Sequence, residues 1–154
     1  MHKGEKPTKE KPVTGQVLAE EIFTLNTWML QIIDKFPRNH KFLLGDKIQN
    51  AGIDLMLAIV DATYTKDRAG LLRQAQMNIE KMRFLFRLAN QAGIVSNGAY
   101  EHAARQLDQV GRGIGGWRKA HSAQGTDAHT TRQSVPTNRD VSGAANSREQ
   151  SDQG

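Results

Sequence analysis

Residues 36–52 read FPRNHKFLLGDKIQNAG, and this stretch is the key to the architecture because one helical pattern ends in it and another begins. Pro37 must end the first pattern, since a proline disfavours the α-helical conformation in the residue before it. Apolar residues at helical spacing resume at Leu44 and Ile48. A connection this short makes the two flanking helices antiparallel neighbours. The stretch therefore predicts a helical hairpin.

The helical spacing continues across most of the chain. Four segments carry apolar residues three and four positions apart, and no strand pattern competes with them. Their stripes are Leu18, Ile22, Leu25, Met29, Ile32 and Phe36; Leu44, Ile48, Ala51, Leu55 and Ile59; Leu72, Ala75, Ile79, Met82, Phe86 and Ala89; and Ala104, Leu107, Gly111, Ile114 and Trp117. The breaks lie at Pro37, at residues 65–67 and at residues 93–98, where Ser96 or Asn97 is the predicted N-cap. The sequence thus predicts an all-α, antiparallel up-down-up-down four-helix bundle over residues 16–121.

The two ends differ in composition from this central part. Residues 1–15 carry two prolines and alternating charges, and residues 122–154 have almost no large apolar side chains. Neither end can bury enough surface to offset the entropy of ordering it. We therefore expect a disordered basic N-terminal arm and a disordered polar C-terminal tail.

The composition of the 154 residues limits the class of protein. The chain has no cysteine, which excludes disulfides and thiolate metal sites and fits a reducing cytoplasm. The first residues carry lysines but no apolar run behind them, so no secretory signal is expected. The longest apolar run is far too short to cross a bilayer. These features predict a cytoplasmic protein without a membrane partner.

The net charge of +5 is unevenly distributed. Residues 16–121 carry fourteen Lys and Arg against ten Asp and Glu, whereas residues 122–154 carry three arginines against four acidic residues. The basic excess therefore belongs to the predicted bundle and the N-terminal arm. An excess of this size favours polyanionic partners, although many proteins that bind none share it.

Enzymatic motifs fail in their context. A bundle that holds two metal ions uses Glu-x-x-His on inward faces, but no acidic residue stands three positions before any histidine of the predicted bundle. His102 and its neighbour Glu101 point to different sides of a helix. Residues 111–116, GRGIGG, match G-x-G-x-x-G formally, but no strand precedes them and a helical pattern runs through them. We expect no catalytic residue, no metal site and no cofactor.

Basic residues form the most informative surface pattern. Arg105, Arg112 and Lys119 recur every seven residues, so they share one face of the last helix. On a single helix such a pattern is typical of a solvated face, but basic patches on three helices favour phosphate contacts, because the planar fork of arginine suits phosphate. The candidate contacts are Arg38, Lys41, Lys47, Arg73, Lys81, Arg83, Arg87, Arg105, Arg112, Arg118 and Lys119. The restart after Pro37 also places the positive end of the second helix's dipole beside Arg38 and Lys41, at one rim of the bundle.

Some apolar residues lie off the main stripes. They are Leu43, Ile53 and Leu57 in the second segment and Phe84, Leu85 and Leu88 in the third. Either they form a second buried surface, which implies self-association or a protein partner, or one thick core absorbs them. Gly45 and Gly52 are seven residues apart on one face and allow a neighbouring helix to approach closely.

Two stretches resemble a known family. FPRNHKFLLGDKIQNAGIDLMLAIVDATYT and MNIEKMRFLFRLANQAGIVSNGAYEHAARQLDQVGRGIGGWRKA are similar to the Avd proteins, the accessory variability determinants of diversity-generating retroelements. The resemblance covers residues 17–120. Its most specific parts are the Pro37-Arg38 break with the following Leu44 to Ile48 turn, the Met82 to Leu88 run, and the closing Gly111 to Trp117 motif. Gly113 departs from the pattern, which has a larger apolar residue at this position.

The resemblance implies a function as well as a fold. Avd proteins form a homo-oligomeric ring, described as a pentamer, with a basic surface that binds the reverse transcriptase of the element and its template-repeat RNA. They support mutagenic cDNA synthesis without being enzymes. The candidate basic residues would then contact nucleic acid or polymerase, and the residues assigned to oligomer packing are Gly45, Gly52, Phe84, Leu88, Gly115, Gly116 and Trp117.

One alternative stays open within the same wider group of four-helix proteins. Some of its members are encoded in intervening sequences of bacterial large-subunit ribosomal RNA genes. A protein of that type would be an oligomeric scaffold or an RNA-associated protein with no polymerase partner.

Overall fold

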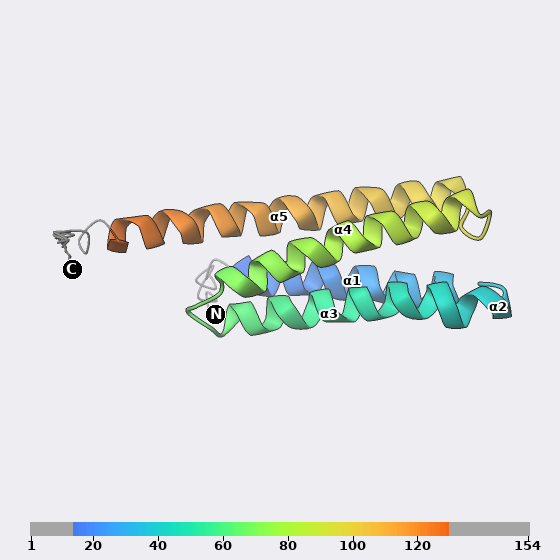
Figure 1. The fold of residues 1–154 in the computed structure, drawn as a ribbon, viewed down its shortest axis with the longest axis horizontal. Helices are drawn as coiled ribbons and strands as arrows, with labels where there is room; N and C mark the ends of the chain where they lie inside the picture. Colours follow the sequence, from blue (N-terminus) through green and yellow to red (C-terminus); the bar gives the residue numbers. More distant parts are fainter. Residues whose placement is uncertain (1–13, 130–154) are drawn as a thin grey trace, which may run out of the picture.

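The computed structural model describes residues 14–129, and this part of the chain is helical with short connections and no strand. Figure 1 shows its elements: α1 (Thr14–Asp34), α2 (Arg38–His40), the π-helix η1 (Lys41–Gly45), α3 (Asp46–Thr63), α4 (Ala69–Gln91) and α5 (Asn97–His129). No helix in the described part is long and apolar enough to span a membrane.

The predicted hairpin at Pro37 is confirmed. The backbone N–H groups of Lys35 and Phe36 close α1 on the carbonyls of Ile32 and Ile33, and Pro37 then takes an extended ψ of 144°. The next rod begins immediately, because the N–H of Lys41 donates to the Pro37 carbonyl at 3.0 Å. The junctions of α2, η1 and α3 keep helical backbone angles, so residues 38–63 form one continuous rod.

Four rods therefore make the bundle. α1 packs on α3 and α5, α3 packs on α4, and α4 packs on α5. Consecutive rods run antiparallel around this ring, as Figure 1 shows. This is the predicted up-down-up-down four-helix bundle.

The turn between α4 and α5 follows the predicted chemistry. Gly93 takes a left-handed φ of 75°, and the Ile94 N–H donates back to the Ala89 carbonyl, which closes α4 with a glycine cap. The Oγ of Ser96 accepts from the Ala99 N–H at 3.2 Å. Ser96 is thus the N-cap of α5, as predicted.

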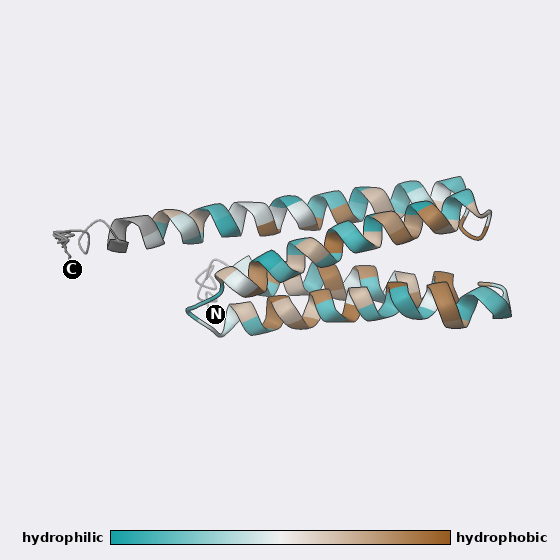
Figure 2. Cartoon of the chain, viewed as in Figure 1, coloured by the Kyte–Doolittle hydropathy of each residue, from teal (hydrophilic) through white to brown (hydrophobic). Residues whose placement is uncertain are grey.

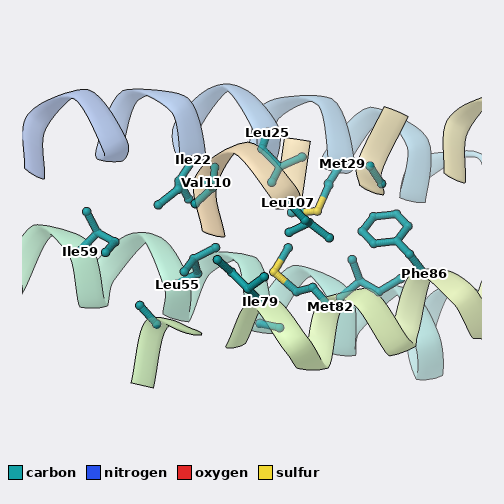
Figure 3. Close-up of a cluster of buried hydrophobic side chains, with 14 of the residues drawn as sticks. Ile22, Leu25, Met29, Leu55, Ile59, Ile79, Met82, Phe86, Leu107 and Val110 are labelled. Carbon is teal, nitrogen blue, oxygen red and sulfur yellow. The ribbon is translucent and has the colours of Figure 1, made fainter. Parts of the chain in front are cut away.

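The core consists of the predicted apolar stripes. Figure 3 shows side chains from all four rods meeting between them, among them Ile22, Leu55, Ile79 and Leu107, each at most 2% exposed. In two of the predicted stripes, some positions are displaced by one residue. In α1 Ile33 is buried whereas Ile32 is half-buried, and in α5 the buried positions are Ala103 and Val110 instead of Ala104 and Gly111. The neighbouring helices decide which of two adjacent apolar residues points inward.

Two glycines allow α1 to pack closely against the second rod. A methyl group on Gly45 would lie 2.7 Å from Cγ2 of Ile33, and one on Gly52 would lie 2.5 Å from Cε of Met29. In the space that Gly52 leaves, the buried Asn26 donates from Nδ2 to the Gly52 carbonyl at 3.0 Å. The predicted close approach of a helix at these two glycines is therefore confirmed, and the approaching helix is α1 of the same chain.

Gly113, the departure from the Avd pattern, also has a partner. A methyl group here would collide with Cδ2 of Leu18 on α1. Leu18 is 3% exposed. The space of the larger side chain expected at residue 113 is thus filled by Leu18 from the neighbouring helix α1.

The C-terminal end of α5 differs from the predicted boundary. The tail expected from residue 122 begins inside α5, which continues to His129 and extends past the other rods in Figure 1. Ala120, Ala123 and Gln124 favour helix, and a helix that is already formed extends at little cost. Most of the N-terminal arm and the rest of the C-terminal tail lie outside the described residues.

We predict that Gly52→Ala lowers the free energy of unfolding by about 1–3 kcal/mol, because the added methyl group meets Asn26 and Met29. Urea denaturation measures this change. The matched control is Gly70→Ala, since nothing lies within 4 Å of a methyl group there. It should leave stability unchanged or raise it by less than about 1 kcal/mol. Equal stability of both variants would contradict the close packing of α1 on α3.

Candidate functional site

The basic residues at the start of the second rod have different surroundings. Arg38 and Lys47 are exposed and form no ion pair with the described residues. Lys41 instead lies 2.9 Å from Oδ1 of Asp34, the last residue of α1. This ion pair links the end of α1 to the start of the second rod. It leaves Lys41 less available for a phosphate contact than Arg38 and Lys47.

The Lys41 ammonium also changes the titration of its partner. Its hydrogen bond and its charge hold the pKa of the Asp34 carboxyl below the usual range. Because the folded-state pKa is lowered, the pair contributes to stability at neutral pH, and this contribution is lost as the pH falls through the carboxyl range. Both side chains are well exposed, so salt weakens the pair.

On α4 the arginines divide into paired and unpaired groups. Arg83 contacts Asp108 of α5 and lies 3.4 Å from Glu80. Arg83 is therefore part of the α4–α5 interface. Arg73, Lys81 and Arg87 are exposed and have no ion pair within the described residues.

α5 carries a continuous basic stripe on its outer side. We use the term α5 basic face for Arg105, Arg112 and Lys119, which are exposed and have no ion pair within residues 14–125. The acidic residues nearest in sequence on this side are Glu101 and Asp108, and Asp108 is engaged by Arg83. Glu101 lies one turn before Arg105 and offsets part of its charge, so the positive excess of the face is concentrated at Arg112 and Lys119.

Arg118 borders the α5 basic face but has a partner. Its guanidinium donates to Oε1 of Gln76 on α4. Arg68, which was not among the candidates, lies over the ring of Trp117 at 5.1 Å. Both arginines secure the end of α5 against α4 and the turn that precedes it.

Exposed apolar side chains gather on the opposite part of the bundle. Large exposed hydrophobic residues occur on α1, η1, α3 and α4, and the described part of α5 has none. Figure 2 shows the same contrast, with a mostly hydrophilic or neutral α5 and brown segments on the other rods. We use the term α3 apolar face for Ile53, Leu57, Val60 and Tyr64, which follow helical spacing on the outer side of α3.

α1 extends the α3 apolar face. Phe23 and Leu30 are exposed and lie three and four residues from Asn26, whose side chain reaches α3. They therefore occupy the edge of α1 next to α3. The thick-core explanation of the surplus apolar residues is wrong for all of them except Leu85, which is half-buried.

The residues assigned to oligomer packing divide between interior and surface. Gly45, Gly52 and Trp117 are buried by side chains of the same chain, and a contact between chains at these residues stays a prediction. The spacing of these residues predicts a close helix contact without specifying which helix makes it.

The other four packing candidates remain accessible in part. Phe84 and Leu88 are exposed on α4, and Gly116 is exposed on α5. Gly115 is half-buried, and a methyl group on it would lie 3.5 Å from Nε2 of Gln76. For these residues a contact between chains stays a prediction.

Sequence reasoning did not single out the groove between α3 and α4. This groove has a volume of about 700 Å³, and its lining includes Asn78 from the buried side of α4. A polar residue beside an apolar stripe was the available signal, and Asn26 shows the same signal in α1. Helical spacing alone ranks such residues as part of the core.

Groups for metal or acid–base chemistry do not converge in the described part of the chain. No cluster of three or more His, Asp or Glu residues there is arranged to hold a metal ion. The His102 ring instead packs on Trp28, with ring centroids 4.5 Å apart. Asp54 and Asp61 are exposed.

Comparison with known proteins gives one match. A family model described as bAvd-like matches residues 16–121, which is most of the chain and the whole predicted bundle. A search of curated protein sequences found no significant match. The family match confirms the resemblance to the Avd proteins, a family of accessory proteins.

We predict that Lys41→Gln raises the pKa of Asp34 toward the ordinary carboxyl value, because it removes both the hydrogen bond and the charge that lower it. A pH titration of the Asp34 carboxyl carbon by NMR measures this shift. Lys47→Gln is the control, since Lys47 has no ion pair within the described residues. An Asp34 titration that does not move in Lys41→Gln would contradict the ion pair.

Proposed function

Because the chain belongs to the bAvd-like family, we propose that it is a non-enzymatic accessory subunit of a diversity-generating retroelement. In this proposal it binds the reverse transcriptase and template-repeat RNA in the cytoplasm and supports mutagenic cDNA synthesis. It acts as a homo-oligomer, and the family resemblance suggests a pentameric ring.

The separation of charge and apolar surface carries this proposal. The α5 basic face lies on one rod, whereas the large exposed apolar residues lie on the other three. An oligomer that buries the α3 apolar face thus leaves the α5 basic face in solvent. Repetition of that face around an assembly raises the local field and strengthens phosphate binding.

Nucleic acid binds along α5 in this proposal. Successive cations of the α5 basic face are about 10 Å apart along the helix, so a strand that follows it meets a cation every few phosphates. Arg73 and Arg87 on α4 are exposed and unpaired within the described residues, and they widen this surface. Arg83 has a supporting role, because it already contacts Asp108.

The reverse transcriptase binds at the start of the second rod in this proposal. Phe42 and Leu43 are about two-thirds exposed on the π-helix, and Arg38 lies one turn before them. Exposed aromatic and aliphatic side chains beside arginine are typical of protein–protein contact centres. This end is separate from the α3 apolar face, so both contacts can form together.

We predict that Arg105→Glu combined with Arg112→Glu greatly weakens RNA binding and leaves helicity unchanged, because both side chains are exposed and unpaired within the described residues. Fluorescence anisotropy over a range of salt concentrations measures the effect. The slope of log affinity against log salt should fall by about 2, since two phosphate contacts are lost.

The control for this double variant carries the same change in charge at other places. Lys35→Glu combined with Lys66→Glu alters two exposed lysines outside α5. It should reduce the affinity far less. Equal losses in the two double variants would show that net charge alone drives binding, and this result would refute the assignment to α5.

We predict that Leu57→Glu reduces the mass of the assembly in light scattering, because it places a charge in the centre of the α3 apolar face. Val17→Glu is the control, since Val17 is an exposed apolar residue of α1 outside that face. The wild-type protein and the control should share one mass above that of the monomer. A monomeric wild type would refute self-association.

A further inference from the structure

The groove between α3 and α4 has the dimensions of a ligand site. Its volume of about 700 Å³ lies within the range of small-molecule pockets. Ala51 from α3 and Met77, Phe84 and Leu85 from α4 contribute apolar walls, and charged side chains of both helices stand among them. The groove is therefore an apolar slot with a polar edge.

Asn78 lines this groove and has a polar group without a partner. Its side chain is 6% exposed, and Nδ2 forms no hydrogen bond within the described residues. The other buried asparagine, Asn26, donates to the Gly52 carbonyl. A leucine at residue 78 would avoid the cost of an unsatisfied donor, so folding alone does not account for an asparagine here. Its terminal torsion is broad, and a rotation about it would exchange the positions of Nδ2 and Oδ1 at the wall of the groove.

Phe84 connects the groove with the basic side of the molecule. Phe84 and Glu80 line the α3–α4 groove, and they also line a smaller pocket of about 240 Å³ together with Arg83, Arg87 and Tyr100. The exposed ring of Phe84 thus stands between a slot on one side and arginines on the other. A nucleic-acid strand that contacts Arg83 and Arg87 therefore passes over the Phe84 ring to reach the groove.

We propose that the α3–α4 groove binds one unstacked base of a single-stranded nucleic acid. The Asn78 amide hydrogen-bonds to the edge of the base, Phe84 stacks on its face, and Lys47 and Lys81 lie beside the adjoining backbone. An aromatic platform together with cations is the combination that single-strand binding proteins use, and asparagine is suited to base edges. This inference rests on the proposed nucleic-acid function and adds a site for the base.

The charges of the groove agree with this ligand. Its acidic members are Asp54 and Glu80, and Glu80 already lies 3.4 Å from Arg83. Lys47 and Lys81 have no ion pair within the described residues. The two lysines and the two carboxylates that line the groove balance, so the groove has no net charge, which suits the neutral ring of a base, and the lysines are left for its phosphates.

The test compares single-stranded with duplex RNA of equal length, both fluorescein-labelled, using oligouridylate and oligoadenylate as the single strands. Asn78→Leu should reduce single-strand affinity roughly tenfold, the usual value of a good base contact. Phe84→Ala should reduce it by a similar factor, and Phe84→Tyr should restore it. Duplex affinity should stay unchanged in all three variants, because stacked bases cannot enter the groove.

Two further measurements separate a binding role from a structural one. The melting temperature of Asn78→Leu should equal or exceed that of the wild type, since the variant removes an unsatisfied buried donor. Val17→Ala, which alters an exposed α1 residue that does not line the groove, should keep wild-type affinity.

The possible failures of this test are distinguishable. Wild-type single-strand affinity in both Asn78→Leu and Phe84→Ala would overturn the base site and leave the proposed function intact. A reduced assembly mass in Phe84→Ala with unchanged RNA affinity would assign the groove to a contact between copies and also overturn the site. A wild-type protein that binds no RNA would refute the nucleic-acid function together with the base site.

Discussion

The close approach of α1 to the second rod, at Gly45 of η1 and Gly52 of α3, fixes the arrangement on which the other two rods are built. These glycines let Ile33 and Met29 approach the α3 backbone, and Asn26 then donates to the Gly52 carbonyl. A slip of the two helices would leave the Asn26 amide buried without an acceptor, which is costly. The hydrogen bond from Asn26 and the two glycines thus define the register of the first two rods.

That register also determines what the molecule shows to solvent. With Gly52 turned toward α1, Leu55 and Ile59 point into the core and Leu57 lies on the opposite, outer side of the helix. α4 and α5 complete the ring, and the core positions of α5 leave Arg112 on the outside. The separation of apolar and basic surfaces is therefore a consequence of how the core is packed.

Helical spacing was sufficient to predict the rods, the turn at Pro37 and nearly all of the core, because periodicity reports burial directly. Helical spacing does not predict ion pairs between rods. Lys41 with Asp34 and Arg83 with Asp108 depend on how two helices are aligned, and a pattern along one helix does not contain that information. The same limit applies to Gly45 and Gly52, whose spacing predicts a close helix contact without specifying which helix makes it.

Buried polar residues were the other part that spacing could not predict. Asn26 and Asn78 both occupy inward positions, yet one has a partner across the bundle and the other has none within the described residues. Only the three-dimensional arrangement distinguishes them. The length of α5 was also underestimated, because local propensity extends it where no core supports it.

The π-helix at Lys41–Gly45 lies within the second rod, close to its start. A π-turn bonds residues five apart where an α-turn bonds residues four apart, so it accommodates one extra residue. Loss of one residue here would restore an ordinary helical turn and rotate the first residues of the second rod by about 100° relative to α3. Evolution can thus redirect Arg38 and Phe42 toward a different partner by a single-codon deletion, while the glycine contact that supports the fold stays in place.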